Sequence, residues 1–75
     1  MLLADFVLKF QECFHQTSPT LIGAETPFRE LEEWNSMMAL IVISMVDSDF
    51  GKELTADHIR NSITVSDLYN AIANL

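Results

Sequence analysis

The fold is decided by residues 35–51, which read NSMMALIVISMVDSDFG. Asn35 is a favourable N-cap residue, because its side chain can accept a hydrogen bond from an N–H group of a helix's first turn. Gly51 stands where a helix terminator is expected. The run 40–43 is rich in β-branched residues and would suit a strand. Its place between a cap and a glycine instead predicts a helix that opens at Asn35 and runs to about Phe50.

This predicted helix has two apolar faces. At about 100° per residue, a core-facing stripe gathers Ala39, Val42, Ile43, Val46 and Phe50. A second apolar face lies beside Ser36, and it consists of Met37, Leu40, Ile41, Ser44 and Asp47. We call this second set the docking face, because an exposed apolar patch is typical of a binding surface. The alternative is that its apolar members simply belong to the core.

Apolar spacing also predicts what precedes this helix. Residues at three- and four-residue steps indicate an amphipathic helix over 2–15. They are Leu3, Phe6, Val7, Phe10, Cys13 and Phe14. Residues 18–34 have no sustained period, so we expect a long ordered loop with a short turn at 28–32. The side chains expected to pin this loop to the core are Leu21, Ile22, Phe28, Leu31 and Trp34.

Two further helix starts follow residue 51. Thr55 is a candidate N-cap for a short helix that reaches about Arg60. Residues 64–67 resemble a capping box with Asp in place of Glu, and they predict the start of a last helix. One side of that helix carries Val65, Leu68, Tyr69, Ile72 and Leu75. The sequence therefore predicts an all-α bundle of three main helices plus one short helix, in a single domain spanning 1–75.

Size and charge limit the function. A chain of 75 residues buries a thin core, so we expect neither a stand-alone enzyme nor a catalytic centre. The net charge of -7 disfavours nucleic acid and anionic membranes, and it favours basic protein surfaces. We expect a monomer that meets protein partners and binds neither nucleic acid nor membrane.

Cysteine and histidine give no sign of a site. Cys13 is the one cysteine, which fits a reducing compartment, and the first ten residues lack a basic leader. We therefore expect a cytoplasmic protein. His15 and His58 have no metal-ligand spacing to other ligands, and residues 47–58 do not fit a calcium loop, so we expect no metal.

Residues 28–37, FRELEEWNSM, resemble the attachment-site region of acyl carrier proteins. That family has a Phe and a Leu upstream of an Asp-Ser-Leu or Asp-Ser-Met triplet, which here reads Asn35-Ser36-Met37. Downstream, the matching residues are Phe50, Gly51, Leu54, Thr64 and Val65, with no gap in their spacing. The resemblance covers nearly the whole chain and implies an acyl-carrier-like bundle.

The resemblance implies that Ser36 receives a 4'-phosphopantetheine arm from coenzyme A. A phosphopantetheinyl transferase would perform this reaction and would recognise the flanking Asn35 and Met37. The arm would carry acyl groups as thioesters for acyl-transferring or synthase enzymes of the fatty acid or polyketide type. The family's acyl pocket corresponds here to Leu54, Ile59 and Ile63, although simple packing explains these residues equally well.

Two residues depart from the family pattern. Asn35 stands where Asp is usual, and it lacks the charge that a basic transferase surface could recognise. Ile41 stands where many fatty-acid carriers have an acidic residue, so docking here would depend more on apolar contact. Two alternatives stay open, namely an unmodified carrier-like interaction module and an aminoacyl or peptidyl carrier.

Overall fold

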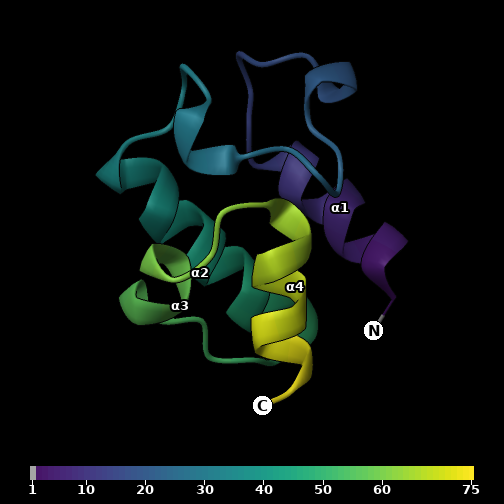
Figure 1. Cartoon of the computed structure of the whole chain (residues 1–75), viewed down its shortest axis with the longest axis vertical. Helices are drawn as coiled ribbons and strands as arrows, with labels where there is room; N and C mark the ends of the chain where they lie inside the picture. The colour runs from purple at the N-terminus through teal and green to yellow at the C-terminus, as the bar shows by residue number, and fades with distance from the viewer. Residues whose placement is uncertain (1) are drawn as a thin grey trace.

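The computed structural model describes residues 2–75, and within them it contains three longer α-helices and a short one (Figure 1). These are α1 (Leu3–Glu12), α2 (Ser36–Phe50), α3 (Ala56–Arg60) and α4 (Val65–Ala73). Two 3-10 turns, η1 (Pro19–Leu21) and η2 (Phe28–Glu30), lie in the connection between α1 and α2. The prediction of an all-α bundle with three main helices and one short helix is confirmed.

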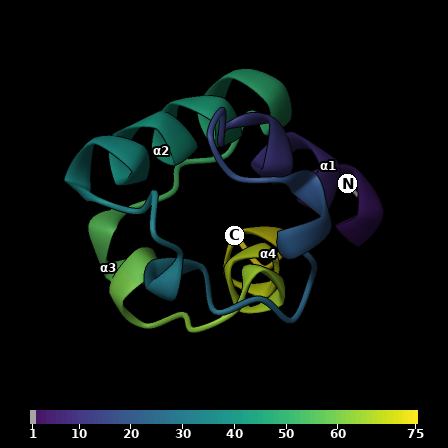
Figure 2. The ribbon, with the colours of Figure 1, turned by 90° about the horizontal axis from the view of Figure 1, so that it is seen from above.

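The helices surround one core. Viewed from above, α1, α2, α3 and α4 form a ring around the interior (Figure 2). Each contributes buried apolar residues, and so does the loop. The core residues are Phe6, Phe10, Phe14, Ile22, Phe28, Met38, Val42, Val46, Leu54, Ile59, Val65, Leu68 and Ile72. Burial of these side chains is the main source of stability, because apolar surface is removed from water.

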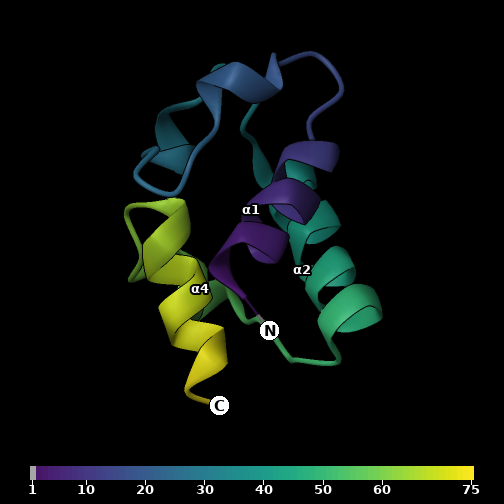
Figure 3. The ribbon, with the colours of Figure 1, turned by 90° about the vertical axis from the view of Figure 1, so that its right-hand side faces the viewer.

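The long connection between α1 and α2 is ordered, as predicted. It crosses one end of the bundle, above the first turn of α4 (Figures 1 and 3). The N–H groups of Val65 and Ser66 donate to the carbonyls of Thr26 (3.2 Å) and Ala24 (2.8 Å). From the α1 side, Gln11 Nε2 donates to the carbonyl of Ile22 at 2.7 Å. These bonds tie the loop to two helices, so it positions the start of α2.

Four of the predicted helix ends are confirmed by local hydrogen bonds and backbone geometry. Asn35 caps α2, and Gly51 ends it in the left-handed region with φ 64°. Thr55 and Thr64 each form a capping box at the start of α3 and α4. Such ends depend on neighbouring residues, which is why their sequence signals are sufficient.

Three expectations about the first and last segments are wrong. The first helix ends at Glu12 instead of about His15, because the carboxylate of Glu33 takes the N–H groups of His15 and Gln16. Leu21 is exposed and does not pin the loop, whereas Ile22 and Phe28 are buried. Leu75 lies beyond the end of α4 and is exposed.

Candidate functional site

Ser36 is the first residue of α2, and its side chain is exposed. The helix begins here because Asn35 Oδ1 accepts the N–H of Met38 at 2.9 Å and its backbone carbonyl accepts that of Ala39 at 3.1 Å. Within residues 2–75, the N–H groups of Ser36 and Met37 have no hydrogen-bond acceptor. Free N–H groups and the helix dipole make such a position favourable for an anion beside the serine hydroxyl.

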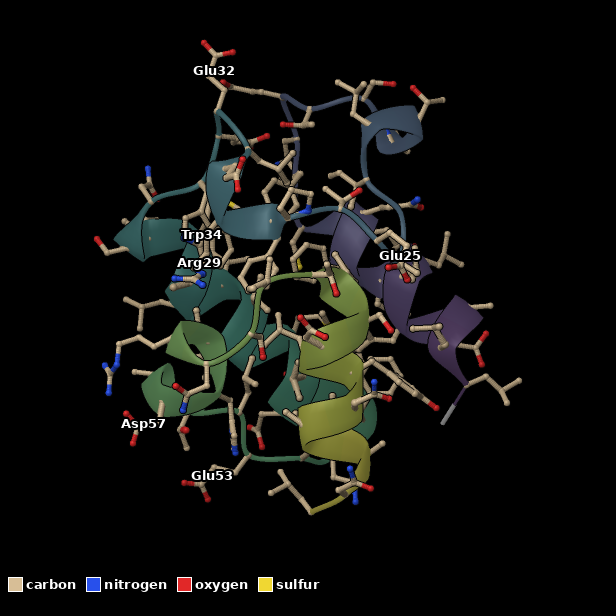
Figure 4. The ribbon with its side chains drawn as sticks, viewed as in Figure 1. Glu25, Arg29, Glu32, Trp34, Glu53 and Asp57 are labelled. Carbon is tan, nitrogen blue, oxygen red and sulfur yellow. The ribbon has the colours of Figure 1, made fainter. Side chains whose placement is uncertain are left out.

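Trp34 holds the chain in place just before this helix. Its ring lies between those of Phe28 and Phe14, with centroids 5.1 Å and 6.3 Å away. In Figure 4 the labelled Trp34 lies close to the bundle, while Glu32 projects outward from the loop. The aromatic contacts therefore anchor the segment that ends at Ser36. This agrees with the prediction that Trp34 pins the loop.

Glu33 holds the start of the loop in place, and apolar spacing could not reveal this role. Its carboxylate accepts hydrogen bonds from the Thr17 hydroxyl (2.7 Å) and from the N–H groups of Gln16 (3.1 Å) and His15 (3.2 Å). The Thr17 bond, followed by the two backbone bonds, lowers the pKa of Glu33 below its usual value. Its partners lie 16 to 18 residues away, so no local spacing reveals the contact.

The docking face lies on the outside of the bundle. Met37 and Leu40 are each 63% exposed, and Ile41 is 40% exposed. Ser44 and Asp47 are exposed on the same helix. The core-facing stripe is covered, with Val42 and Val46 buried and Ala39, Ile43 and Phe50 packed against the core. The alternative that the apolar members of the docking face belong to the core is therefore excluded.

The residues assigned to an acyl pocket are separated by the structure. Leu54 and Ile59 are buried in the shared core, but Ile63 is 61% exposed. Ser62 takes the inward position at this turn, and its hydroxyl donates to the carbonyl of His58 at 2.7 Å. Ile63 points outward because the chain turns there into the cap of α4. The structure thus places Leu54 and Ile59 together in the core and Ile63 on the surface, and their role as an acyl pocket stays a prediction.

A shallow depression adjoins the docking face where α2 meets the α2–α3 loop. Its volume is about 220 Å³, and it is lined by Leu40, Ile43, Ser44, Asp47, Lys52, Glu53 and Leu54. Leu54 forms its buried end, while Glu53 projects outward (Figure 4). The sequence pattern did not reveal that these α2 and loop residues line one hollow.

In the described residues, neither a cluster of metal ligands nor a reactive thiol is found. Among residues 2–75, no group of three or more His, Cys, Asp and Glu side chains could hold a metal ion. Cys13 is half-buried, and burial raises the pKa of its thiol to about 11, with Asp49 and Glu12 adding to the effect. A thiol with so high a pKa is a poor nucleophile at neutral pH.

No model of a known protein family matches this chain, and no curated protein or solved structure matches it either. In the part of the chain that the structure describes, no helix is long and apolar enough to cross a membrane.

Proposed function

We propose that this chain is an acyl carrier protein in which Ser36 carries a 4'-phosphopantetheine arm. The observation that supports the proposal is the exposed hydroxyl of Ser36 at the first position of a capped helix, beside an exposed apolar face. The sequence resemblance implies that the attachment serine would be at this position. When bound, the arm supplies a thiol that holds acyl groups as thioesters.

The residues around Ser36 fit such a group. The free N–H groups of Ser36 and Met37 favour a phosphodiester at the start of α2. Neither histidine makes a hydrogen bond to Ser36 within residues 2–75. The chain would therefore offer an accessible hydroxyl, and the transferase would supply the base that accepts its proton.

The docking face supports a role in presenting cargo to enzymes. Its apolar side chains are exposed in the described structure, and Asp47 adds an acidic group at one end. Together with the net charge of -7, this surface suits enzymes with an apolar patch bordered by basic residues. The protein partners would be the phosphopantetheinyl transferase and acyl-transferring or synthase enzymes.

A second candidate is an unmodified interaction module with the same fold. The observation that favours it is the neutral Asn35, which caps α2 as Asp would but gives a basic transferase surface no charge to recognise. Such a module would use the docking face alone.

Mass spectrometry after incubation with coenzyme A, magnesium and a broad-specificity transferase separates the two candidates. We expect one phosphopantetheine group, mapped to Ser36 and lost in Ser36→Ala. Ser44→Ala is the matched control, since Ser44 is an exposed serine on the same helix. An unmodified chain would favour the module, provided that Asn35→Asp also stays unmodified. An adduct on another residue would contradict the site.

A further inference from the structure

The start of α3 is closed by a histidine side chain. His58 N–H donates to Thr55 Oγ1 at 3.3 Å, and Thr55 N–H donates to His58 Nδ1 at 3.0 Å. A backbone N–H can only donate, so Nδ1 must be the acceptor in this bond. His58 is therefore neutral in this arrangement, with its proton on Nε2.

The next helix uses the same motif with a different acceptor. At the start of α4, Asp67 Oδ2 accepts the N–H groups of Thr64 and Ile63, each at 3.0 Å. A carboxylate keeps its acceptor atoms throughout the physiological pH range, whereas a histidine gains a proton between about pH 8 and pH 5. Two adjacent helix starts thus differ in whether mild acid can remove their cap.

We propose that His58 is a pH-operated latch on α3. Protonation at Nδ1 removes the acceptor of Thr55 N–H and leaves two N–H donors facing each other. A protonated Nδ1 could still donate to Thr55 Oγ1, which lies 3.2 Å away, but this does not restore an acceptor for Thr55 N–H. The bond needs neutral His58, so its contribution to α3 is complete at higher pH and is lost as the pH falls.

Release of this cap should loosen the whole of α3, because the helix is short. It comprises only Ala56–Arg60, and so short a helix has little stability of its own. His58 also accepts at its carbonyl the hydroxyl of Ser62, whose own carbonyl accepts Arg29 Nη2 at 2.8 Å. His58 therefore lies in the network that joins α3 to the loop before α2.

Loosening of α3 would affect the part of the core that lies beside α2. Ile59 is the buried residue of α3, and Leu54, in the loop before α3, is buried in the same core. In Figure 2, α3 stands next to α2 on the ring of helices. Loosening of α3 at mildly acidic pH would expose these two side chains, whether or not Ser36 is modified.

Charged groups lie around His58, and none of them replaces the lost bond. On α3, Asp57 forms an ion pair with Arg60. From α4, Asp67 lines with His58 a surface depression of about 390 Å³. Glu53 lies in the preceding loop, and Arg29 reaches the far end of α3 through Ser62. None of these charged groups accepts the Thr55 N–H, which donates to His58 Nδ1.

Amide hydrogen exchange measured by NMR tests the latch. The probes are the N–H groups of Ile59 and Asn61, which donate within α3 to Thr55 and Asp57. After correction for intrinsic exchange, we expect their protection to fall about fivefold between pH 7.5 and pH 5.5, as for loss of a helix cap. Unchanged protection in the native sequence would overturn the proposal.

Two variants test whether the change in protection depends on the imidazole ring of His58. In His58→Gln the side-chain carbonyl can accept the same N–H without titrating, so protection should stay constant with pH. His15→Gln is the matched control, since it removes the other histidine, and it should behave as the native sequence does. A pH-dependent loss that persists in His58→Gln would overturn the assignment. So would a ¹⁵N spectrum at pH 7.5 showing the proton of His58 on Nδ1.

Discussion

The two sides of α2 differ in burial although both are apolar. On the inner side, Val42 is fully buried, while its neighbour Ile41 on the outer side is 40% exposed. Met38 and Met37 form a second such pair, with Met38 buried and Met37 exposed. Residue type is the same within each pair, or nearly so, and only the direction of the side chain differs.

The cause lies in what faces each side. The inner side packs against the phenylalanines of α1, including Phe6, whose ring lies 5.9 Å from that of Phe50 on α2. The outer side has no such cover in residues 2–75, which leaves Met37, Leu40 and Ile41 in water. Hydrophobicity alone therefore does not identify the core side of this helix. The core side is the one that is turned toward the other helices.

The largest expected effect comes from placing a charge on each side. Val42→Glu puts a carboxylate in the core, where an unpaired charge is strongly disfavoured. The cost should approach the few kcal/mol that hold so small a domain together (about 5–15 kcal/mol is usual for proteins). We expect this variant to be largely unfolded by circular dichroism. Ile41→Glu should change the free energy of unfolding by no more than about 0.5 kcal/mol.

Urea denaturation of both variants tests whether the two sides of α2 differ in burial in solution. Equal destabilisation by the two substitutions would mean that the outer side is also covered in solution, for example by a second copy of the chain. In that case the destabilisation of Ile41→Glu would depend on protein concentration.

Truncation of the methionine pair gives a smaller effect in the same direction. Met38→Ala should cost about 2–3 kcal/mol, because it removes buried apolar atoms and leaves a cavity. Met37→Ala should change the free energy of unfolding by about 0.5 kcal/mol or less. Urea titrations, checked against thermal melts, measure the change in the free energy of unfolding for each variant. A cost for Met38→Ala as small as that for Met37→Ala would place Met38 outside the core.

How far the sequence predicts this molecule depends on the distance over which each feature is determined. The caps at Asn35, Thr55 and Thr64 and the terminator Gly51 were predictable because each depends on residues within one turn. The docking face was predictable because helix geometry fixes the phase of its residues. Whether Ser36 carries an arm stays a prediction.

Features set by distant contacts were not predictable. The early end of α1 depends on Glu33, which lies 17 residues from Gln16. The inward position of Ser62, which leaves Ile63 outside, involves Arg29, a residue 33 positions away that donates to the Ser62 carbonyl. In both cases a polar side chain redirects the backbone, and apolar periodicity contains no signal for that.

The smallest expected effect concerns the C-terminal end of the inner side, where α2 faces Cys13. A depression of about 410 Å³ lies between α1 and α2 here, and its lining includes Cys13, Met45 and Asp49. Burial is the main reason that the thiol pKa is raised from 9.0 to about 11, and the Asp49 carboxylate is the second. A shift of this size leaves about a hundredfold less thiolate at pH 8 than in an ordinary cysteine.

Asp49→Asn removes the second cause and leaves the first, so the pKa of Cys13 should fall but stay above 9.0. The measurement is the rate of iodoacetamide alkylation as a function of pH, and the midpoint should move down by a fraction of a unit. Asp57→Asn makes the same change of charge on α3, away from this depression, and should leave the midpoint unchanged. The removal of an acidic group from the negative end of α2 should also raise the melting temperature slightly. An alkylation midpoint near 9.0 in the native sequence would mean that Cys13 is open to water, and the inner side of α2 would then be less well covered at this end than its buried valines indicate.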